Sequence, residues 1–183
     1  DELTGMLVCT AKGGPIPKST GAGQGIDRND GPRATPTVEG DRLYMLGAGG
    51  RLTCLETATG KESWRKEFAA ALGGQMMSRW GYAESVLVDG DQVVCTPGSP
   101  KGTVAALDKR TGKVLWQTRA YVHPNEPYDT KCAPLFADGK LITYGEYGPI
   151  TLFDVNTGKL LATLPRPGAL DRDYFSGPFP GKD

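Results

Sequence analysis

The residues able to do chemistry are few in this chain of 183 residues, and their spacing matches no common catalytic or metal site. Cys9, Cys54, Cys95 and Cys132 lie 45, 41 and 37 residues apart, so no Cys-x-x-Cys pair exists for a metal, haem or redox centre. His123 is the only histidine, which excludes a multi-histidine metal site. Cys54 and Cys95 lie in apolar, strand-like segments, so we expect buried structural thiols and predict no bond between them.

Three polar segments carry side chains that could bind a metal ion or act as acid and base. Asp27–Asp30 carries several side-chain oxygens but lacks the spacing of a calcium loop, which favours a solvated turn. His123–Asp129 combines His, Glu, Tyr and Asp, which suit a metal or acid–base site, but its prolines favour an exposed loop. Asp171–Asp173 is interpreted as part of a polar tail. We therefore assign no catalytic residue and no metal ligand.

The balance of positive and negative charges limits the kinds of partner that the chain could attract. Lys plus Arg and Asp plus Glu number 21 each, so no basic field attracts nucleic acid or an anionic membrane. No apolar run approaches the ~20 residues that span a bilayer, and the chain does not begin like a signal peptide. The alternatives are a cytoplasmic protein, an exported protein whose leader has been removed, and a piece of a longer protein.

An internal repeat of about 50 residues supplies the elements that would position any site. Its two anchors are glycine turns that occur three times each: Gly40, Gly90 and Gly139 in hairpin turns, and Gly60, Gly112 and Gly158 in Thr-Gly-Lys turns. Each copy predicts four short strands, with glycine supplying the positive φ of the hairpin. Four antiparallel strands at this period are typical of a propeller blade. The predicted fold is an all-β propeller of four-stranded antiparallel blades.

The fourth predicted strand carries a tryptophan in two of the three copies, Trp64 and Trp116. A side chain of this size can lie between neighbouring blades and bury roughly 150–250 Å². The third copy has Ala162 at the same place. We therefore expect a weaker joint, or an edge, beyond the third blade.

The segments Cys54–Trp64 and Ala106–Trp116 resemble the PQQ-type propeller repeat, in which an acidic turn precedes Thr-Gly and Trp. That repeat occurs in eight-bladed quinoprotein alcohol dehydrogenases and in a scaffold lipoprotein of outer-membrane assembly. Gly31–Val38 and Trp80–Ser85 resemble a secreted, planctomycete-type bacterial group of PQQ-like proteins. The resemblance implies a periplasmic or extracellular protein, with protein partners or other chains that complete the propeller. It defines the fold more sharply than the activity.

A quinoprotein site would need an aromatic floor, a calcium ion and an Asp base. The family's Trp-Asp motif and vicinal cysteine pair are both missing from the sequence. Neither PQQ nor calcium is therefore expected in this chain. The resemblance favours a non-catalytic scaffold or binding module. The alternatives are part of a quinoprotein oxidoreductase whose active site lies outside this chain, and a propeller that acts on carbohydrate or polymer.

Loops at one mouth of a propeller are the usual place for a ligand. In the resembling family, two segments enter first strands from that side, and they predict a rim for a ligand or an interface at Arg33, Arg79, Trp80 and Tyr82. Arginine and aromatic side chains are also common anchors of protein interfaces.

We predict one whole or partial propeller domain over residues 1–183, with blades near 33–68, 83–120 and 131–165. Segments 1–32 and 166–183 then form partial blades or one split blade. The alternatives are a four-bladed ring, a half-propeller and an excerpt of a larger propeller. The last two are favoured because the end segments are poor, proline-rich copies.

Overall fold

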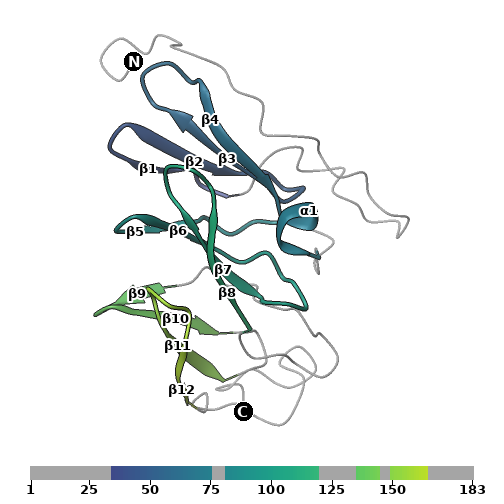
Figure 1. The fold of residues 1–183 in the computed structure, drawn as a ribbon, viewed down its shortest axis with the longest axis vertical. Helices are drawn as coiled ribbons and strands as arrows, with labels where there is room; N and C mark the ends of the chain where they lie inside the picture. The colour runs from purple at the N-terminus through teal and green to yellow at the C-terminus, as the bar shows by residue number, and fades with distance from the viewer. Residues whose placement is uncertain (1–33, 76–80, 120–134, 145–148, 165–183) are drawn as a thin grey trace, which may run out of the picture.

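The computed structural model describes residues 34–75, 81–119, 135–144 and 149–164. They form three four-stranded antiparallel sheets that follow one another along the longest axis of the molecule (Figure 1). In each sheet the strands lie in sequence order, so consecutive strands are neighbours. This confirms the all-β class and the four-stranded blade, and the sheets are called blade 1, blade 2 and blade 3 from the N-terminus.

The described residues contain twelve strands and one helix, with the following bounds. Blade 1 contains β1 (Thr37–Glu39), β2 (Arg42–Leu46), β3 (Arg51–Glu56) and β4 (Glu62–Glu67). It is followed by α1 (Phe68–Leu72). Blade 2 contains β5 (Leu87–Asp89), β6 (Gln92–Cys95), β7 (Val104–Asp108) and β8 (Val114–Thr118). Blade 3 contains β9 (Leu135–Ala137), β10 (Lys140–Tyr144), β11 (Ile150–Asp154) and β12 (Leu160–Leu164).

Two-residue hairpin turns join the first two strands of each blade. Gly40 and Gly90 hold positive φ angles of 58° and 54° at the first turn position. In blade 3 both turn residues, Asp138 and Gly139, have positive φ, at 49° and 70°. Both positive angles suit a type I′ turn, whose twist matches that of the flanking strands. The predicted hairpins are therefore present, with a different turn chemistry in blade 3.

A register shift between the third and fourth strands recurs in all three blades. It leaves Cys54 opposite Trp64 in blade 1 and Ala106 opposite Trp116 in blade 2. In blade 3, Leu152 lies opposite Ala162. The pairing of the strands therefore places Ala162 at the position that tryptophan holds in the other two blades, as the sequence alignment predicted.

The core lies between the sheets, and we call the face of a blade toward the next blade its forward face and the other its rear face. The forward face of blade 1 buries Tyr44, Leu46, Leu52 and Cys54 against rear-face residues of blade 2 such as Leu107. Between blades 2 and 3 a second cluster contains Val94, Val104, Ala106, Leu141, Phe153 and Val155. Blade 2 is covered on both faces, which explains why its third strand is an almost unbroken apolar run.

Helix α1 was not predicted from the sequence. Its ends, Phe68 and Leu72, are buried in the cluster between blades 1 and 2. Gly73 follows in the left-handed conformation, and the Gly74 N–H donates to the Phe68 carbonyl at 2.8 Å. Of the helices in the described part of the chain, none has the length and apolar character to cross a membrane.

Candidate functional site

Tyr82 is the one member of the predicted rim that lies within the described residues. Only 7% of it is exposed, and its ring meets that of Phe68 edge to face, with centroids 5.2 Å apart. Its hydroxyl donates to the Pro97 carbonyl at 3.0 Å, and its N–H donates to the Ala48 carbonyl at 2.9 Å. Burial raises the pKa of the Tyr82 phenol. Tyr82 therefore packs between loops of blades 1 and 2 rather than facing solvent.

Two glycines make room for this tyrosine. Gly50 has a φ of 83°, and a Cβ there would lie 2.6 Å from the Tyr82 ring. Gly81 has a φ of 77°, and a Cβ there would lie 2.7 Å from the Ala48 carbonyl oxygen. A side chain at either position would therefore displace the ring or the adjoining backbone.

The other three members of the predicted rim, Arg33, Arg79 and Trp80, lie outside the described residues. The structure therefore does not test whether the four side chains meet, and the rim stays a prediction. Asp27–Asp30, His123–Asp129 and Asp171–Asp173 also lie outside the described residues.

The joint between blades 1 and 2 is organised by Trp64. Its indole Nε1 donates to the Lys109 carbonyl of blade 2 at 3.0 Å, and the Tyr44 hydroxyl donates to the same carbonyl at 3.2 Å. The indole lies on Gly112, where a Cβ would be 2.8 Å from the ring. We call this arrangement the Trp–Gly contact. It joins the fourth strand of one blade to the Thr-Gly-Lys turn of the next.

The joint between blades 2 and 3 repeats this arrangement with one changed donor. The Trp116 Nε1 donates to the Val155 carbonyl at 3.1 Å, and a Cβ on Gly158 would lie 2.5 Å from its ring. The second donor to that carbonyl is Gln92 Nε2, at 2.8 Å. The predicted role of the two tryptophans between blades is confirmed. Tyr44 and Gln92 were missed, because only the three-dimensional register brings them to the carbonyl.

Two aspartates shape the turns that receive the tryptophans. Asp108 Oδ1 accepts from the Thr111 hydroxyl at 2.8 Å, and Asp154 Oδ1 accepts from the Thr157 hydroxyl at 2.8 Å. These hydroxyl bonds, followed by bonds from backbone N–H groups, lower the pKa of both carboxyls. Both carboxylates therefore hold the turn backbone in the shape that presents Gly112 and Gly158.

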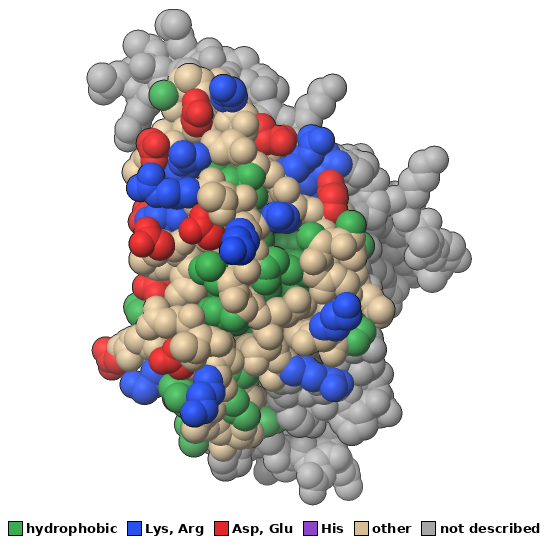
Figure 2. Space-filling model, in the orientation of Figure 1, with side chains coloured by type: hydrophobic (Ala, Val, Ile, Leu, Met, Phe, Trp, Pro, Cys, Tyr) green, Lys and Arg blue, Asp and Glu red, His purple; other side chains and the backbone are tan. Residues whose placement is uncertain are grey.

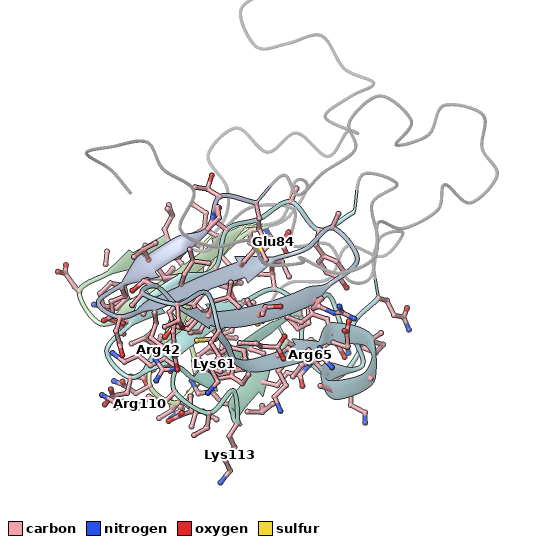
Figure 3. All side chains as sticks on the ribbon, turned by 90° about the horizontal axis from the view of Figure 1, so that it is seen from above. Arg42, Lys61, Arg65, Glu84, Arg110 and Lys113 are labelled. Atoms are coloured by element: carbon pink, nitrogen blue, oxygen red, sulfur yellow. The ribbon has the colours of Figure 1, made fainter. Side chains whose placement is uncertain are left out.

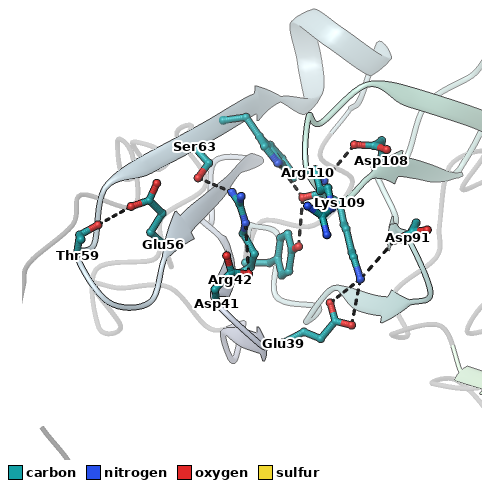
Figure 4. A network of polar contacts seen from close by, with 12 residues as sticks. Glu39, Asp41, Arg42, Glu56, Thr59, Ser63, Asp91, Asp108, Lys109 and Arg110 are labelled. Atoms are coloured by element: carbon teal, nitrogen blue, oxygen red, sulfur yellow. Dashed lines mark hydrogen bonds and ion pairs between the residues drawn. The ribbon is translucent and has the colours of Figure 1, made fainter.

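Charged side chains of both signs surround the hairpin and Thr-Gly-Lys turns. Lys109 Nζ lies 3.1 Å from a Glu39 carboxylate oxygen of blade 1 and 3.7 Å from one of Asp91 (Figure 4). Arg42 donates to the Ser63 hydroxyl at 2.6 Å within blade 1. Figure 3 shows Arg42 and Arg110 on the same side of the ribbon, with Glu84 apart from them. The turn end of these blades is therefore a network of paired charges rather than a field of one sign.

The thiols within the described residues, Cys54 and Cys95, are free and buried. Burial raises the pKa of each, which disfavours the reactive thiolate. The prediction of buried, unbonded thiols in adjacent blades is confirmed for this pair. Within the four described ranges, no group of three or more His, Cys, Asp or Glu side chains is placed to hold a metal ion.

The blades, their turns and the Trp–Gly contacts define a class, the PQQ-type β-propeller repeat. The chain belongs to the PQQ-like repeat family, since the family model described as outer membrane protein assembly factor BamB matches residues 2–172.

Known proteins similar to this chain fall into two groups. Quinohemoprotein alcohol dehydrogenase ADH IIB of Pseudomonas putida is 30% identical over 162 residues, which are 81% of this chain and 23% of that protein. Outer membrane protein assembly factor BamB of Salmonella typhimurium is 25% identical over 147 residues, 80% of this chain and 32% of that protein. The chain therefore spans about a quarter to a third of these relatives.

The likeness extends to solved structures. That of BamB from Moraxella catarrhalis matches with a TM-score of 0.54 at 22% identity, covering 73% of this chain and 37% of that one. At this identity the match shows the propeller fold alone. The chain is thus a propeller segment related both to assembly factors and to dehydrogenases.

Proposed function

We propose that this chain is a non-catalytic propeller segment that acts as a scaffold and binds a protein or another ligand. The main observation behind the proposal is that the aromatic and polar side chains at the blade joints bind the neighbouring blade. Trp64, Trp116, Tyr44 and Gln92 all donate to backbone carbonyls of the next blade. These groups hold blades together, and the loops at the propeller mouth are left as the place for recognition.

The matched family model supports the same proposal, because its description is that of an assembly factor. By the same relationship we propose a periplasmic or extracellular location. The partners would be proteins that bind at the loops, and further blades would complete the propeller.

A second candidate function is part of a PQQ-dependent oxidoreductase whose active site lies outside this chain. It is favoured by the 30% identity to a quinohemoprotein alcohol dehydrogenase. Under this alternative the three blades support a cofactor held by other parts of a larger propeller. PQQ would supply a quinone that accepts electrons from an alcohol.

Titration with PQQ and calcium separates the two candidates when it is carried out on a propeller completed by its remaining blades. Under the scaffold proposal we expect neither a saturable change in quinone absorbance nor a rise in the melting temperature. Calcium-dependent binding with stabilisation would contradict the scaffold proposal and support the quinoprotein alternative. Replacing Arg33 and Trp80 with alanine should leave that binding unchanged, because the alternative places the active site outside this chain.

The same double substitution tests the rim directly. The variant with Arg33→Ala and Trp80→Ala should keep the melting temperature of the parent and lose at least tenfold in affinity for a purified partner. Arg65→Ala is a matched control, because Arg65 lies on β4 and is exposed. Unchanged affinity in the double variant would discard the rim.

A further inference from the structure

The hairpin between β9 and β10 carries the dipeptide Asp138–Gly139, a pair whose side chain and backbone can react with each other. Ala137 pairs with Lys140, so Asp138 and Gly139 are the two turn residues. Asp138 has a φ of 49° and is, among the described residues other than glycine, the one with a positive φ. The aspartate is followed by a glycine, which has no Cβ to shield its nitrogen from the carboxyl.

The three hairpins use two related turns. In blades 1 and 2 the first turn residue, Gly40 or Gly90, has a positive φ, and the aspartate that follows it does not. One positive angle at the first position is the pattern of a type II′ turn, whereas Asp138 and Gly139 follow type I′. The two types differ chiefly in the ψ of the first residue, which sets the orientation of the peptide between the turn residues. A flip of the Asp138–Gly139 peptide plane therefore gives blade 3 the turn that the other blades already have.

This flip brings the reacting atoms together. A bond between the Gly139 nitrogen and the Asp138 Cγ closes a five-membered ring, which requires Cβ and that nitrogen to be eclipsed about the Cα–C bond. For an L residue this corresponds to a ψ of about −120°, the value at the first position of a type II′ turn. The flip keeps φ positive, so the flanking strands can keep their pairing.

The turn is open to solvent, so the flip disturbs little packing. Asp138 is exposed, and a Cβ on Gly139 would meet no atom within 4 Å. All three residues of β9 are exposed as well. Figure 2 shows charged side chains of both signs at the left edge of the molecule, where the tip of this hairpin lies in Figure 1. The Lys140 ammonium donates to the Asp138 carbonyl at 3.3 Å, a long bond from an exposed side chain that holds the peptide only weakly.

We propose that Asp138 is a modification site at which the chain forms isoaspartate by its own chemistry. The Gly139 nitrogen attacks the protonated Asp138 carboxyl, a C–N bond forms, and the carboxyl hydroxyl leaves as water with the proton of the nitrogen. Water then opens the resulting succinimide. Attack at Cγ restores aspartate, and attack at the main-chain carbonyl carbon gives isoaspartate, whose backbone runs through Cβ and Cγ. The water lost in the first step is regained in the second, so no other reactant is consumed.

The same dipeptide in blade 2 is held away from this reaction. Asp89 is the last residue of β5, pairs with Gln92 and is partly buried. An extended residue has a ψ of about +135°, far from the value that the ring requires, so ring closure needs Asp89 to leave the sheet. The Gly90 carbonyl also accepts from Lys109 Nζ at 2.7 Å, which holds the next peptide in place. The two Asp–Gly pairs therefore differ in structure and not in chemistry.

Isoaspartate lengthens the backbone of the turn by one methylene group and leaves its charge unchanged. Because β9 is exposed, the longer turn loosens β9 while the pairing of β10 with β11 is kept. The modified turn presents an isoaspartyl carboxylate to solvent, the substrate class of enzymes that methylate such groups. The inference is independent of whether the propeller binds a partner protein or supports a quinone.

The test ages the complete chain in warm, mildly acidic buffer made with heavy-oxygen water, because each opening of the succinimide adds one heavy oxygen atom. Trypsin then releases Asp138 in a peptide of residues 132–140 and Asp89 in one of residues 80–101. Backbone fragmentation in a mass spectrometer identifies isoaspartate in each peptide. In the folded chain, isoaspartate should form about tenfold faster at Asp138, because ladder hydrogen bonds at Asp89 must open first.

Urea and two variants separate the structural cause from the local sequence. In urea, where neither aspartate is held, the two rates should become nearly equal. Asp138→Gly combined with Gly139→Asp is the matched control, since it gives the turn the Gly–Asp order of blades 1 and 2. The label in this peptide should then disappear, because no glycine follows the aspartate. Asp89→Glu should leave the rate at Asp138 unchanged.

Three outcomes would overturn the proposal. They are no isoaspartate at Asp138, equal rates at Asp138 and Asp89 in the folded chain, and a difference between the two rates that persists in urea.

Discussion

Blade 2 and blade 3 are built from the same four-strand repeat, but their faces are used differently. Blade 2 receives Trp64 on its rear face and sends Trp116 from its forward face. Blade 3 receives Trp116 and presents Ala162. One of the five residues of β8 is exposed, whereas four of the five residues of β12, the equivalent fourth strand, are exposed. The repeat therefore determines where the strands form, and the neighbouring blades determine how deeply the residues of each face are buried.

This difference indicates that each tryptophan stabilises the joint with the next blade and not the packing within its own blade. The indole contributes apolar area, a hydrogen bond to a turn carbonyl and contact with a glycine that has no Cβ. The blade with an alanine in this place, blade 3, keeps its strand pairing and has no indole to offer to a neighbour.

Trp64→Ala should lower the free energy of unfolding by about 3–5 kcal/mol, the usual cost of removing a buried tryptophan. Trp116→Ala should cost less, because Trp116 is only partly buried. Urea denaturation of both variants measures the costs. Hydrogen exchange should show faster opening of blades 1 and 2 in the first variant. Equal stability of Trp64→Ala and the parent would break the comparison.

Gly112→Ala should cost about 3 kcal/mol, from left-handed backbone strain and displacement of the Trp64 ring. Gly90→Ala in the same blade is the control. Gly90 has a similar φ of 54° but no atom within 4 Å of an added Cβ. Its cost should be about 1–2 kcal/mol, from the strain alone. Equal costs in denaturant would show that the indole does not need the bare glycine.

Alkaline pH should weaken the joint between blades 1 and 2 through Cys95. Burial raises the pKa of this thiol above its ordinary value of 9.0, so the folded chain keeps a proton that the unfolded chain loses. This stability is complete below about pH 9 and falls as pH rises, by up to about 1.4 kcal/mol per pH unit.

Cys95→Ala should reduce that dependence between pH 8.5 and 10, as measured by urea midpoints, and the buried Cys54 thiol, whose pKa is also raised by burial, should account for what is left. The buried phenol of Tyr82 adds a further loss only above about pH 10, where an ordinary tyrosine ionises. In blade 3 the equivalent position is Thr143, which does not titrate in this range. An unchanged slope in the variant would exclude Cys95 as the cause.

Lys109→Met should have the smallest effect, below about 1 kcal/mol, because the carboxylates that Lys109 pairs with, Glu39 and Asp91, are exposed to solvent and such ion pairs contribute little. Lys109 joins Glu39 of blade 1 to the turn of blade 2, with Nζ 2.7 Å from the Gly90 carbonyl. The loss should shrink at high salt, where the pairs are screened. A salt-independent loss would instead indicate that the aliphatic part of the side chain packs in the joint.

Much of the fold was predictable from local signals. The glycine turns and alternating apolar residues placed the strands, and the alignment of Trp64 with Trp116 predicted large side chains between blades. Helix α1 was not predictable, because five residues are too few to form a stable helix alone, even though Ala and Leu favour one, and it depends on contacts made elsewhere. Gln117 Nε2, for example, donates to the Leu72 carbonyl at 3.0 Å from across the joint.

The candidate rim differs from the blades, because three of its four residues lie outside the described residues and the rim stays a prediction. Tyr82 was chosen for its aromatic side chain, but it is buried, with its hydroxyl bonded to the Pro97 carbonyl. An aromatic residue in a loop gives no sign of which way its ring turns, since both packing and recognition use aromatic side chains. The positions of Arg33, Arg79 and Trp80 stay predictions.

The repeat, the turn positions and the replacement of tryptophan by Ala162 can be read from the chain alone. These are local properties, because positive φ, strand alternation and turn hydrogen bonds depend on residues close in the chain. Tertiary packing sets which carbonyl each indole reaches and which residues assist it. Those features depend on the stacking of sheets about 50 residues apart in sequence, where packing of whole faces sets the geometry.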